Sequence, residues 1–220
     1  MFDFDFPMLK ELDLNRNLLT GSFPFVIGNL KSLERVYLFQ NSMSGSLPAA
    51  ISRLASLEIL ELSDNSFSGQ IPESIGNLSA LSRFEMGGNR LSGPLPSSFS
   101  DLLMIEYVEL NDNHLTSTLP MSIGDLTTLK RFRVNGNNMT GSIPNEMCGL
   151  GKLQQLYMQD NRFTSSLPQD FTNLTSLQFF HGSENSLTGS LPSLDFSMQK
   201  LLFLNVSSNY LTGTPELSFT

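Results

Sequence analysis

The stretch "LEILELSDNSFSGQIPESIGNLSA", residues 57–80, contains every element of a pattern that recurs along the whole chain. The pattern is L-x-x-L-x-L-x-x-N-x-L/F-x-G-x-I/L-P-x-x-I-G-x-L-x-x. A fixed period of this length is typical of solenoids, in which similar units stack on one another. We therefore expect one repeat domain over residues 1–220. Full repeats of 24 residues begin at Leu9, Leu33, Leu57, Leu81, Ile105, Leu129, Leu153 and Leu177, and a partial ninth repeat covers residues 201–220.

Each repeat contains two kinds of local pattern. The L-x-L alternation has a period of two and predicts a short strand, whereas the I/L-P-x-x-I-G-x-L segment predicts a helical turn. One repeat cannot bury its apolar residues alone, so neighbouring repeats must stack to enclose them. The expected fold is an α/β repeat solenoid, curved and right-handed, with a parallel β-sheet on its concave face and short 3-10 or helical turns on its convex face.

An Asn column marks the sharp turn that follows each predicted strand. A buried amide both donates and accepts hydrogen bonds, so stacked Asn side chains can satisfy backbone groups of neighbouring coils. We interpret this column as structural. It comprises Asn17, Asn41, Asn65, Asn89, Asn113, Asn137, Asn161, Asn185 and Asn209.

The L-x-G-x-I/L-P segment within a 24-residue period resembles the plant-type subclass of leucine-rich repeat proteins, as in the ectodomains of receptor-like kinases and receptor-like proteins. The match covers almost the whole chain. The resemblance implies a non-catalytic module that recognises a protein or peptide on its concave face, in signalling. Any membrane segment or kinase would then lie elsewhere in a longer chain. Two alternatives remain: a free-standing inhibitor or defence protein that binds a basic enzyme, and a cytosolic scaffold.

The composition restricts the partners and the chemistry. The formal net charge of −8 argues against nucleic acid, because phosphate recognition depends on clustered Lys and Arg. No apolar run approaches the roughly 18 residues of a membrane span, and no signal peptide opens the chain. Cys148 is the single cysteine, so an internal disulfide is excluded. We expect no enzyme activity, no cofactor and no metal site. A receptor-like protein would be extracellular or at the cell surface, whereas a scaffold would be cytoplasmic.

The variable positions lie two, four and six residues after the first Leu of each repeat, where side chains should point to the concave surface. In consecutive repeats, Glu61, Glu85 and Glu109 form an acidic ridge that suits a basic partner. The alternative is that solvent screens the ridge and that Arg133 pairs with Glu109. The predicted ligand-binding residues are Tyr37, Phe39, Glu61, Arg83, Glu85, Tyr107, Glu109, Arg131, Arg133, Tyr157, Phe179 and His181.

Within this face, the "RFR" stretch places Arg131 and Arg133 on one side of a strand, where together they can fork a carboxylate or phosphate. The resemblance implies the same role, since in plant peptide-hormone receptors of this class a concave Arg-x-Arg pair holds the C-terminal carboxylate of the ligand. The alternative again involves neighbouring repeats, with Arg133 on Glu109 and Arg131 stacked on Tyr107.

Two further expectations concern the surface and the ends of the chain. The N-x-S/T sequons at Asn77, Asn138, Asn173 and Asn205 are candidate N-glycosylation sites. The opening "MFDFDFPM", residues 1–8, resembles "SLDFSMQK", residues 193–200, which predicts the tail of a preceding partial repeat and hence a fragment of a longer solenoid. Because neither end shows a polar cap, we expect self-association through exposed coil ends.

Overall fold

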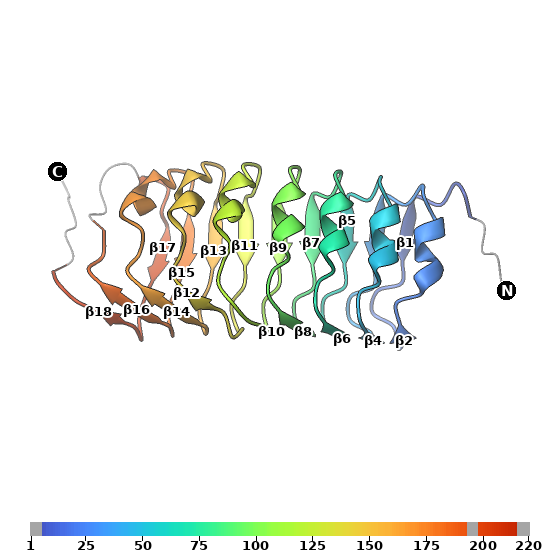
Figure 1. The fold of residues 1–220 in the computed structure, drawn as a ribbon, viewed down its shortest axis with the longest axis horizontal. Helices are drawn as coiled ribbons and strands as arrows, with labels where there is room; N and C mark the ends of the chain where they lie inside the picture. Colours follow the sequence, from blue (N-terminus) through green and yellow to red (C-terminus); the bar gives the residue numbers. More distant parts are fainter. Residues whose placement is uncertain (1–5, 193–197, 215–220) are drawn as a thin grey trace.

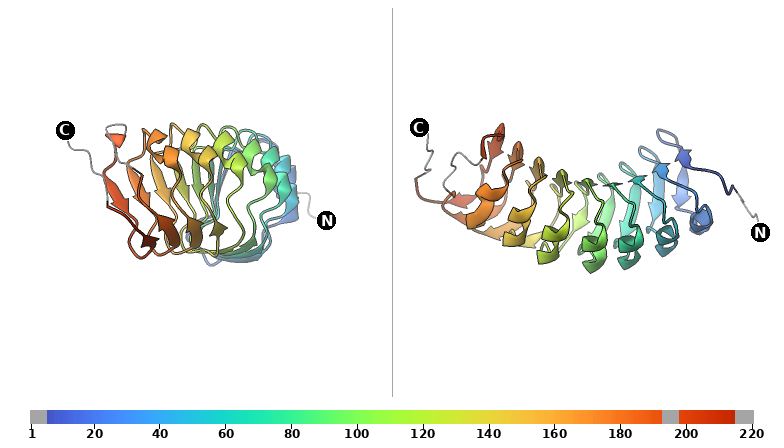
Figure 2. Two further views of the ribbon diagram at one scale, coloured as in Figure 1. Left: turned by 60° about the vertical axis from the view of Figure 1, so that its left-hand side comes forward. Right: turned by 90° about the horizontal axis from the view of Figure 1, so that it is seen from above.

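The computed structural model describes residues 6–192 and 198–214 and shows a curved solenoid of stacked coils (Figures 1 and 2). Each coil contributes a strand to a large sheet, another short strand to a second layer and, in most coils, a 3-10 helix. The large sheet lines the concave side of the arc, and the 3-10 helices lie on the convex side (Figure 2). The α/β solenoid expected from the repeat is confirmed.

The large sheet is parallel, and its strands follow one another in chain order. Neighbouring strands pair residues that are 24 positions apart, as Glu61 with Glu85. The central residue of most strands is buried, for example Leu60 and Phe84, while its two neighbours are partly exposed on the concave face. Within the described residues the strands are β1 (Glu11–Asp13), β3 (Arg35–Tyr37), β5 (Ile59–Glu61), β7 (Arg83–Glu85), β9 (Tyr107–Glu109), β11 (Arg131–Arg133), β13 (Gln155–Tyr157), β15 (Phe179–His181) and β17 (Phe203–Asn205).

A 3-10 helix follows the Pro of the repeat, as predicted from the I/L-P-x-x-I-G-x-L segment. Pro lacks an N–H group and has a fixed φ, both of which suit the start of a helix. The Gly of this segment allows close packing: a Cβ on Gly124 would lie 2.5 Å from the carbonyl oxygen of Glu146 in the next coil. The described helices are η1 (Phe25–Asn29), η2 (Ala49–Arg53), η3 (Glu73–Asn77), η4 (Ser97–Asp101), η5 (Met121–Asp125), η6 (Asn145–Gly149) and η7 (Gln169–Asn173).

A second layer of short parallel strands follows the Asn column, and the sequence analysis did not predict it. Most of these strands contain a Gly with a positive φ, for example 79° at Gly69. At the same position of its repeat, Ser117 has a φ of 75°. One sheet contains β2 (Thr20–Ser22), β4 (Ser42–Gly45), β6 (Ser66–Gly69), β8 (Arg90–Gly93) and β10 (His114–Leu115). Another contains β12 (Thr140–Gly141), β14 (Arg162–Ser165), β16 (Ser186–Gly189) and β18 (Tyr210–Leu211).

The apolar core runs along the axis between these layers, and the Asn column lies beside it. Asn113 is representative: its Oδ1 accepts the backbone N–H of Leu91 at 2.8 Å, and its Nδ2 donates to the carbonyls of Met86 and Leu110 at 2.9 and 3.2 Å. One amide therefore joins its own coil to the preceding coil. The suggested likeness of residues 1–8 to residues 193–200 falls mainly on positions outside the described residues.

Candidate ligand-binding face

The central part of the concave face, strands β7 to β15, brings together most of the residues predicted from the sequence. Each strand is only three residues long, so its first and third side chains both face the concave side while the second enters the core. The parallel register aligns Arg83 with Tyr107 and Arg131, and Glu85 with Glu109 and Arg133. The result is two parallel columns of charged and aromatic side chains.

The two arginines of "RFR" share one carboxylate, that of Glu109. Arg131 donates from Nη1 to Oε1 of Glu109 at 2.9 Å, and Arg133 donates from Nη1 to Oε2 at 3.3 Å. The side chain of Glu109 is mostly buried, and the side chains of both arginines are about one-third exposed. The geometry is therefore that of a carboxylate held by an arginine pair, with the carboxylate supplied by the neighbouring strand of the same chain.

The guanidinium groups of Arg83, Arg131 and Arg133 also pack against aromatic rings. The Cζ of Arg83 lies 4.7 Å from the ring centroid of Tyr107, and that of Arg131 lies 5.6 Å from the same ring. Arg133 stands 5.1 Å from the ring of Tyr157. These cation–π contacts limit the movement of the arginine side chains and leave donors directed along the concave face.

The carboxylates of the acidic ridge differ in their burial and in their hydrogen bonds. Glu85 is only 8% exposed, and its Oε1 accepts one hydrogen bond, from Arg83 Nη1 at 3.2 Å. Burial, reinforced by the charges of Glu109 and Glu61, raises the pKa of Glu85 to about 7. Burial also raises the pKa of Glu61, against the opposing effect of Arg83. Near neutral pH the middle of the ridge thus carries less negative charge than three carboxylates would suggest.

Aromatic side chains continue the face toward the C-terminal coils. The ring of His181 makes edge contacts with Tyr157 and Phe203, with centroids 6.5 and 5.5 Å apart. Its Nε2 lies 2.9 Å from Ser183 Oγ and 3.0 Å from Asn205 Nδ2. Burial lowers the pKa of His181. Phe203 was absent from the predicted set, although it stands in the same sequence column as Phe179, which it contacts.

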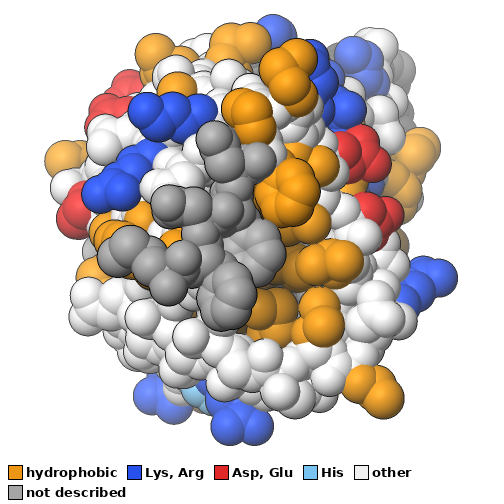
Figure 3. Space-filling model, turned by 90° about the vertical axis from the view of Figure 1, so that its right-hand side faces the viewer, with side chains coloured by type: hydrophobic (Ala, Val, Ile, Leu, Met, Phe, Trp, Pro, Cys, Tyr) orange, Lys and Arg blue, Asp and Glu red, His pale blue; other side chains and the backbone are white. Residues whose placement is uncertain are grey.

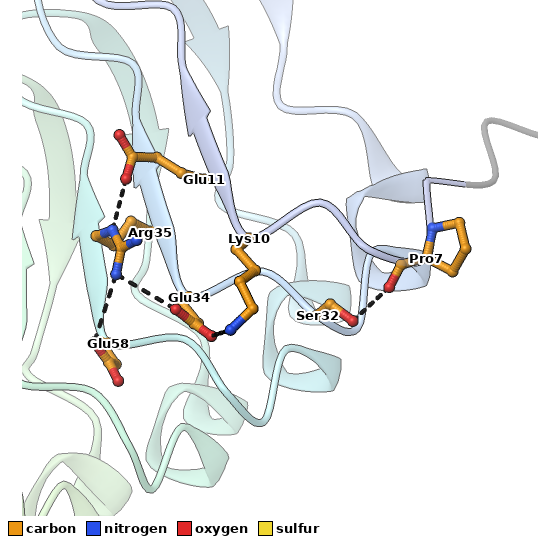
Figure 4. Close-up of polar contacts among 7 residues, drawn as sticks. All are labelled: Pro7, Lys10, Glu11, Ser32, Glu34, Arg35 and Glu58. Atoms are coloured by element: carbon orange, nitrogen blue, oxygen red, sulfur yellow. Dashed lines mark hydrogen bonds and ion pairs between the residues drawn. The ribbon is translucent and has the colours of Figure 1, made fainter.

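Tyr37 and Phe39 lie in an earlier coil, apart from the arginine pair. The ring of Phe39 has the guanidinium of Arg16 at 5.7 Å. In the strand of Tyr37, Arg35 forms a network of ion pairs and reaches Glu11 at 2.7 Å and Glu34 at 3.4 Å (Figure 4). Lys10 adds a 2.6 Å contact to Glu34. Exposed pairs of this kind contribute little to stability, typically below about 1 kcal/mol. This end of the concave face is therefore a solvated polar surface.

Four buried polar atoms near the arginine pair make no hydrogen bond within the described part of the chain. They are Arg131 Nε, Arg133 Nε, Asn135 Oδ1 and Gln159 Oε1. All belong to two consecutive coils, which contain β11 and β13. Neighbouring side chains shield these atoms from solvent, so a ligand could reach them only after those side chains move.

The outward side of the second layer carries a surface that the sequence analysis missed. One position of each repeat, in or beside these strands, is occupied by a small hydroxyl side chain; most of these side chains are exposed, and none makes a side-chain hydrogen bond within the described residues. The signal was present in the sequence as a Ser/Thr column three residues after the ladder Asn. The column comprises Thr20, Ser44, Ser68, Ser92, Thr116, Thr140, Thr164, Thr188 and Thr212.

The remaining candidates are positioned as follows. Asn77 and Asn173 are exposed at the ends of η3 and η7 on the convex side, whereas Asn205 lies on the concave face beside His181. Asn138 is partly exposed at the second layer. Across residues 6–192 and 198–214, no three or more His, Cys, Asp or Glu side chains gather in a way that would bind a metal ion. No helix in these ranges has the length and apolarity needed to cross a bilayer.

Comparisons with known proteins agree with this architecture. A leucine rich repeat family model matches residues 7–67 and 105–163, and a second leucine rich repeat model matches residues 80–102. A comparison with curated protein sequences gave no match.

Solved structures of two plant receptors are similar to the chain. A TDR receptor superposes with a TM-score of 0.91 and 36% identity over 93% of this chain and 36% of its own. The Arabidopsis receptor kinase HAESA, in complex with the peptide hormone IDA and the co-receptor SERK1, superposes with a TM-score of 0.85 and 32% identity. The match covers 91% of this chain and 34% of the receptor's. The chain thus spans about a third of the length of these receptors. A plant ice-binding protein superposes with a TM-score of 0.71 and 25% identity, over 94% of this chain and 74% of its own.

Proposed function

We propose that this chain, which belongs to the leucine-rich repeat family, is a recognition module whose concave face binds an extended peptide or a protein segment, as in receptor-like leucine-rich repeat proteins. The observation that carries the proposal is the band of charged and aromatic side chains on β7 to β15, centred on Arg131, Arg133 and Glu109. The similarity to the peptide-binding receptor HAESA supports the same class of ligand.

The chemistry of the band suits a peptide in two respects. The rings of Tyr157, Phe179 and His181 offer flat apolar area of the kind that dominates binding energy at interfaces. The arginine pair would bind a ligand carboxylate, provided that this carboxylate displaces Glu109 from the same donors.

A peptide screen tests this proposal directly. Pooled short synthetic peptides are presented to the folded chain with either free or amidated C-termini, and bound peptides are identified and titrated. The test variant is Arg131→Ala with Arg133→Ala. The matched control is Arg90→Ala with Arg162→Ala, which removes the same charge from the exposed side of β8 and β14, away from the concave face.

We expect the test variant to weaken binding of free-acid peptides at least tenfold and to affect their amidated forms less, while the control binds like the parent. An equal loss for both kinds of peptide would remove the carboxylate role but keep the concave site. If no peptide binds, or if the control loses as much affinity as the test variant, the concave face is not the recognition surface.

A second candidate function rests on a different surface, the Ser/Thr column of the second layer. Neighbouring parallel strands stand about 4.8 Å apart, so the Ser/Thr side chains of this column form one row of regular spacing. Regular arrays of hydroxyl and methyl groups order water at fixed spacings, as binding to ice requires. The similarity to a plant ice-binding protein, most of whose length the chain covers, favours this candidate.

Ice recrystallisation assays separate this candidate from peptide recognition. Thr140→Tyr with Thr164→Tyr would interrupt the array without entering the core, since both side chains are exposed. The matched control is Ser79→Tyr with Thr127→Tyr, two exposed positions outside the array. Slower ice-crystal growth with the parent and the control, but not with the array variant, is the expected result. Ice growth equal to that in buffer would eliminate the candidate.

A further inference from the structure

Glu85 stands in the middle of the acidic ridge and has less counter-charge than its neighbour Glu109. The strand register places Glu61 on one side of Glu85 and Glu109 on the other. Glu109 accepts hydrogen bonds from two arginines, at 2.9 and 3.3 Å. Glu85 accepts one, from Arg83 at 3.2 Å, and no other within the described residues. It is therefore a carboxylate between two others, with a single ion pair to offset its charge.

Glu85 is also shielded from water. In the end-on view of the solenoid in Figure 3, Lys, Arg, Asp and Glu side chains lie around the outside of the coil. Glu85, in contrast, is only 8% exposed. A buried carboxylate loses its hydration, and neighbouring carboxylates oppose its ionisation. The pKa of Glu85 is about 7 as a result, so this carboxyl group gains or loses a proton near neutral pH.

The charged groups around Glu85 lie on its own strand and on its neighbours. After burial, the charges of Glu109 and Glu61 raise its pKa most, whereas those of Arg83 and Arg131 lower it. The other titratable or charged side chains at the first and third positions of β5 to β11 are Tyr107 and Arg133. The next column on this face carries no charge and comprises Ser63, Gly87, Asn111 and Asn135.

A ligand carboxylate on Arg131 or Arg133 would change the balance of charge at Glu85. It would offset positive charge that lowers the pKa of Glu85, and it would bring a further negative charge close to the ridge. Where it takes the donors that now hold Glu109, that side chain also loses its counter-charge beside Glu85. Each of these changes favours the protonated form of Glu85.

We propose that the concave face takes up a proton at Glu85 when a ligand carboxylate binds to Arg131 and Arg133, so that acidic conditions strengthen binding. The inference rests on the function proposed above. The proton comes from solvent and joins the Glu85 carboxylate, which becomes a neutral carboxyl group, and no other covalent bond changes. Three arginines on β7 and β11 then face two carboxylates, Glu61 and Glu109, in place of three.

The direction of the pH dependence follows from the pKa of Glu85 in two states. This pKa is about 7 in the free protein and should be higher in the complex. Binding of an anionic ligand is therefore tightest below about pH 7 and weakens as the pH rises toward the pKa of the complex. The C-terminal carboxylate of a peptide has a pKa of about 3.5 and stays ionised throughout this interval.

Carbon-13 NMR of the glutamate carboxyl groups tests the electrostatic part without a ligand. In the parent, Glu85 should titrate at about 7, and its signal is identified by its loss in Glu85→Gln. Arg131→Gln with Arg133→Gln removes the charges that a bound carboxylate would offset, and should raise the pKa of Glu85. Arg90→Gln with Arg162→Gln is the control, which removes the same charge away from the concave face and should leave Glu85 as in the parent.

Calorimetric titration with a peptide tests the coupling itself. The probe is the tightest free-acid peptide from the screen above that lacks His and Cys, made with an acetylated N-terminus, and compared with its amidated form. We expect free-acid binding to weaken about threefold or more between about pH 6 and pH 8.5, with proton uptake seen in buffers of different ionisation enthalpy. The amidated form should change less. Burial lowers the pKa of His181, so this ring should stay neutral over the same interval.

Glu85→Gln imitates the protonated group and should bind the free-acid peptide equally at both pH values. A pH dependence that persists in this variant, or that is as large for the amidated peptide, would overturn the proton coupling. So would free-acid binding to the parent that does not change with pH, or an unchanged titration of Glu85 after Arg131→Gln with Arg133→Gln. These results would leave the recognition function in place, whereas a screen in which no peptide binds at either pH would overturn that function as well.

Discussion

Arg131 on β11 donates a 2.9 Å hydrogen bond to the carboxylate of Glu109 on β9, its neighbour in the concave sheet. Arg133 occupies the other oxygen of that carboxylate. The candidate ligand site therefore contains its own counter-ion, and any anionic group of a ligand must compete with it. Its affinity for a carboxylate depends on how strongly Glu109 is held.

A double-mutant cycle measures this strength. We expect Arg131→Met and Glu109→Gln to show a coupling energy of about 1 kcal/mol in urea unfolding, because the pair is partly buried. Lys10→Met with Glu34→Gln is the matched cycle. That pair is closer, at 2.6 Å, but more exposed, and should couple by less than about 0.5 kcal/mol. A stronger coupling for Lys10 and Glu34 would show that the distance between the charged atoms, and not their burial, determines the coupling energy.

Glu85 should make stability depend on pH between 4.5 and about 7. Its pKa is raised to about 7, so the folded state binds the proton more tightly than the unfolded state, and stability falls as the pH rises through this interval. The full effect on the free energy of unfolding is on the order of 3 kcal/mol. Glu85→Gln should flatten this part of the profile in urea unfolding at several pH values and should be more stable than the parent above pH 7.

Glu73→Gln is the contrasting control for this experiment. Hydrogen bonds from the backbone of Ser98 and Ser97 lower the pKa of Glu73, so its contribution to stability is present above 4.5 and is lost on acidification. This variant should alter the acid end of the profile and leave the slope between 4.5 and 7 intact. An unchanged slope in Glu85→Gln would contradict the assignment to Glu85.

Replacement of a ladder Asn should lower the free energy of unfolding far more in the middle of the solenoid than in the first described coil. Asn137→Ala would leave the Leu115 N–H and the Leu110 carbonyl without the bonds that Asn137 now supplies at 2.8 and 2.9 Å. We expect a loss of about 3 kcal/mol in the free energy of unfolding. Asn17→Ala removes only exposed local bonds and should cost less than about 1 kcal/mol. Similar losses for both would argue against a bridging role for the amide.

The Gly residues of the convex turns provide a packing test. Gly124→Ala would place a Cβ against the carbonyl of Glu146 in the next coil and should destabilise the fold by about 1–3 kcal/mol. Gly149→Ala meets no atom within 4 Å and should be tolerated. Thermal unfolding followed by circular dichroism compares the two. Equal melting temperatures would show that the coils can move apart at little cost.

The sequence predicted the solenoid, its register and the faces of its strands, because the 24-residue period dictates which residues stack. It also placed Arg131, Arg133 and Glu109 on one surface. It did not decide between a free arginine pair and one bound to Glu109, since that depends on side-chain conformations across two strands. The second layer was missed for another reason: most of its strands contain a Gly, which is depleted in strands, and they depend on pairing with the next coil.

The constant spacing of 24 residues between paired positions of the concave sheet also limits how the length of this protein can change. Removal of a single residue inside a coil would shift every later side chain relative to the preceding coil, so that apolar residues would face solvent. Removal or duplication of a whole 24-residue unit would leave each remaining contact in place. The length of the concave face can therefore vary only by whole coils, with one new set of concave side chains gained or lost at each step.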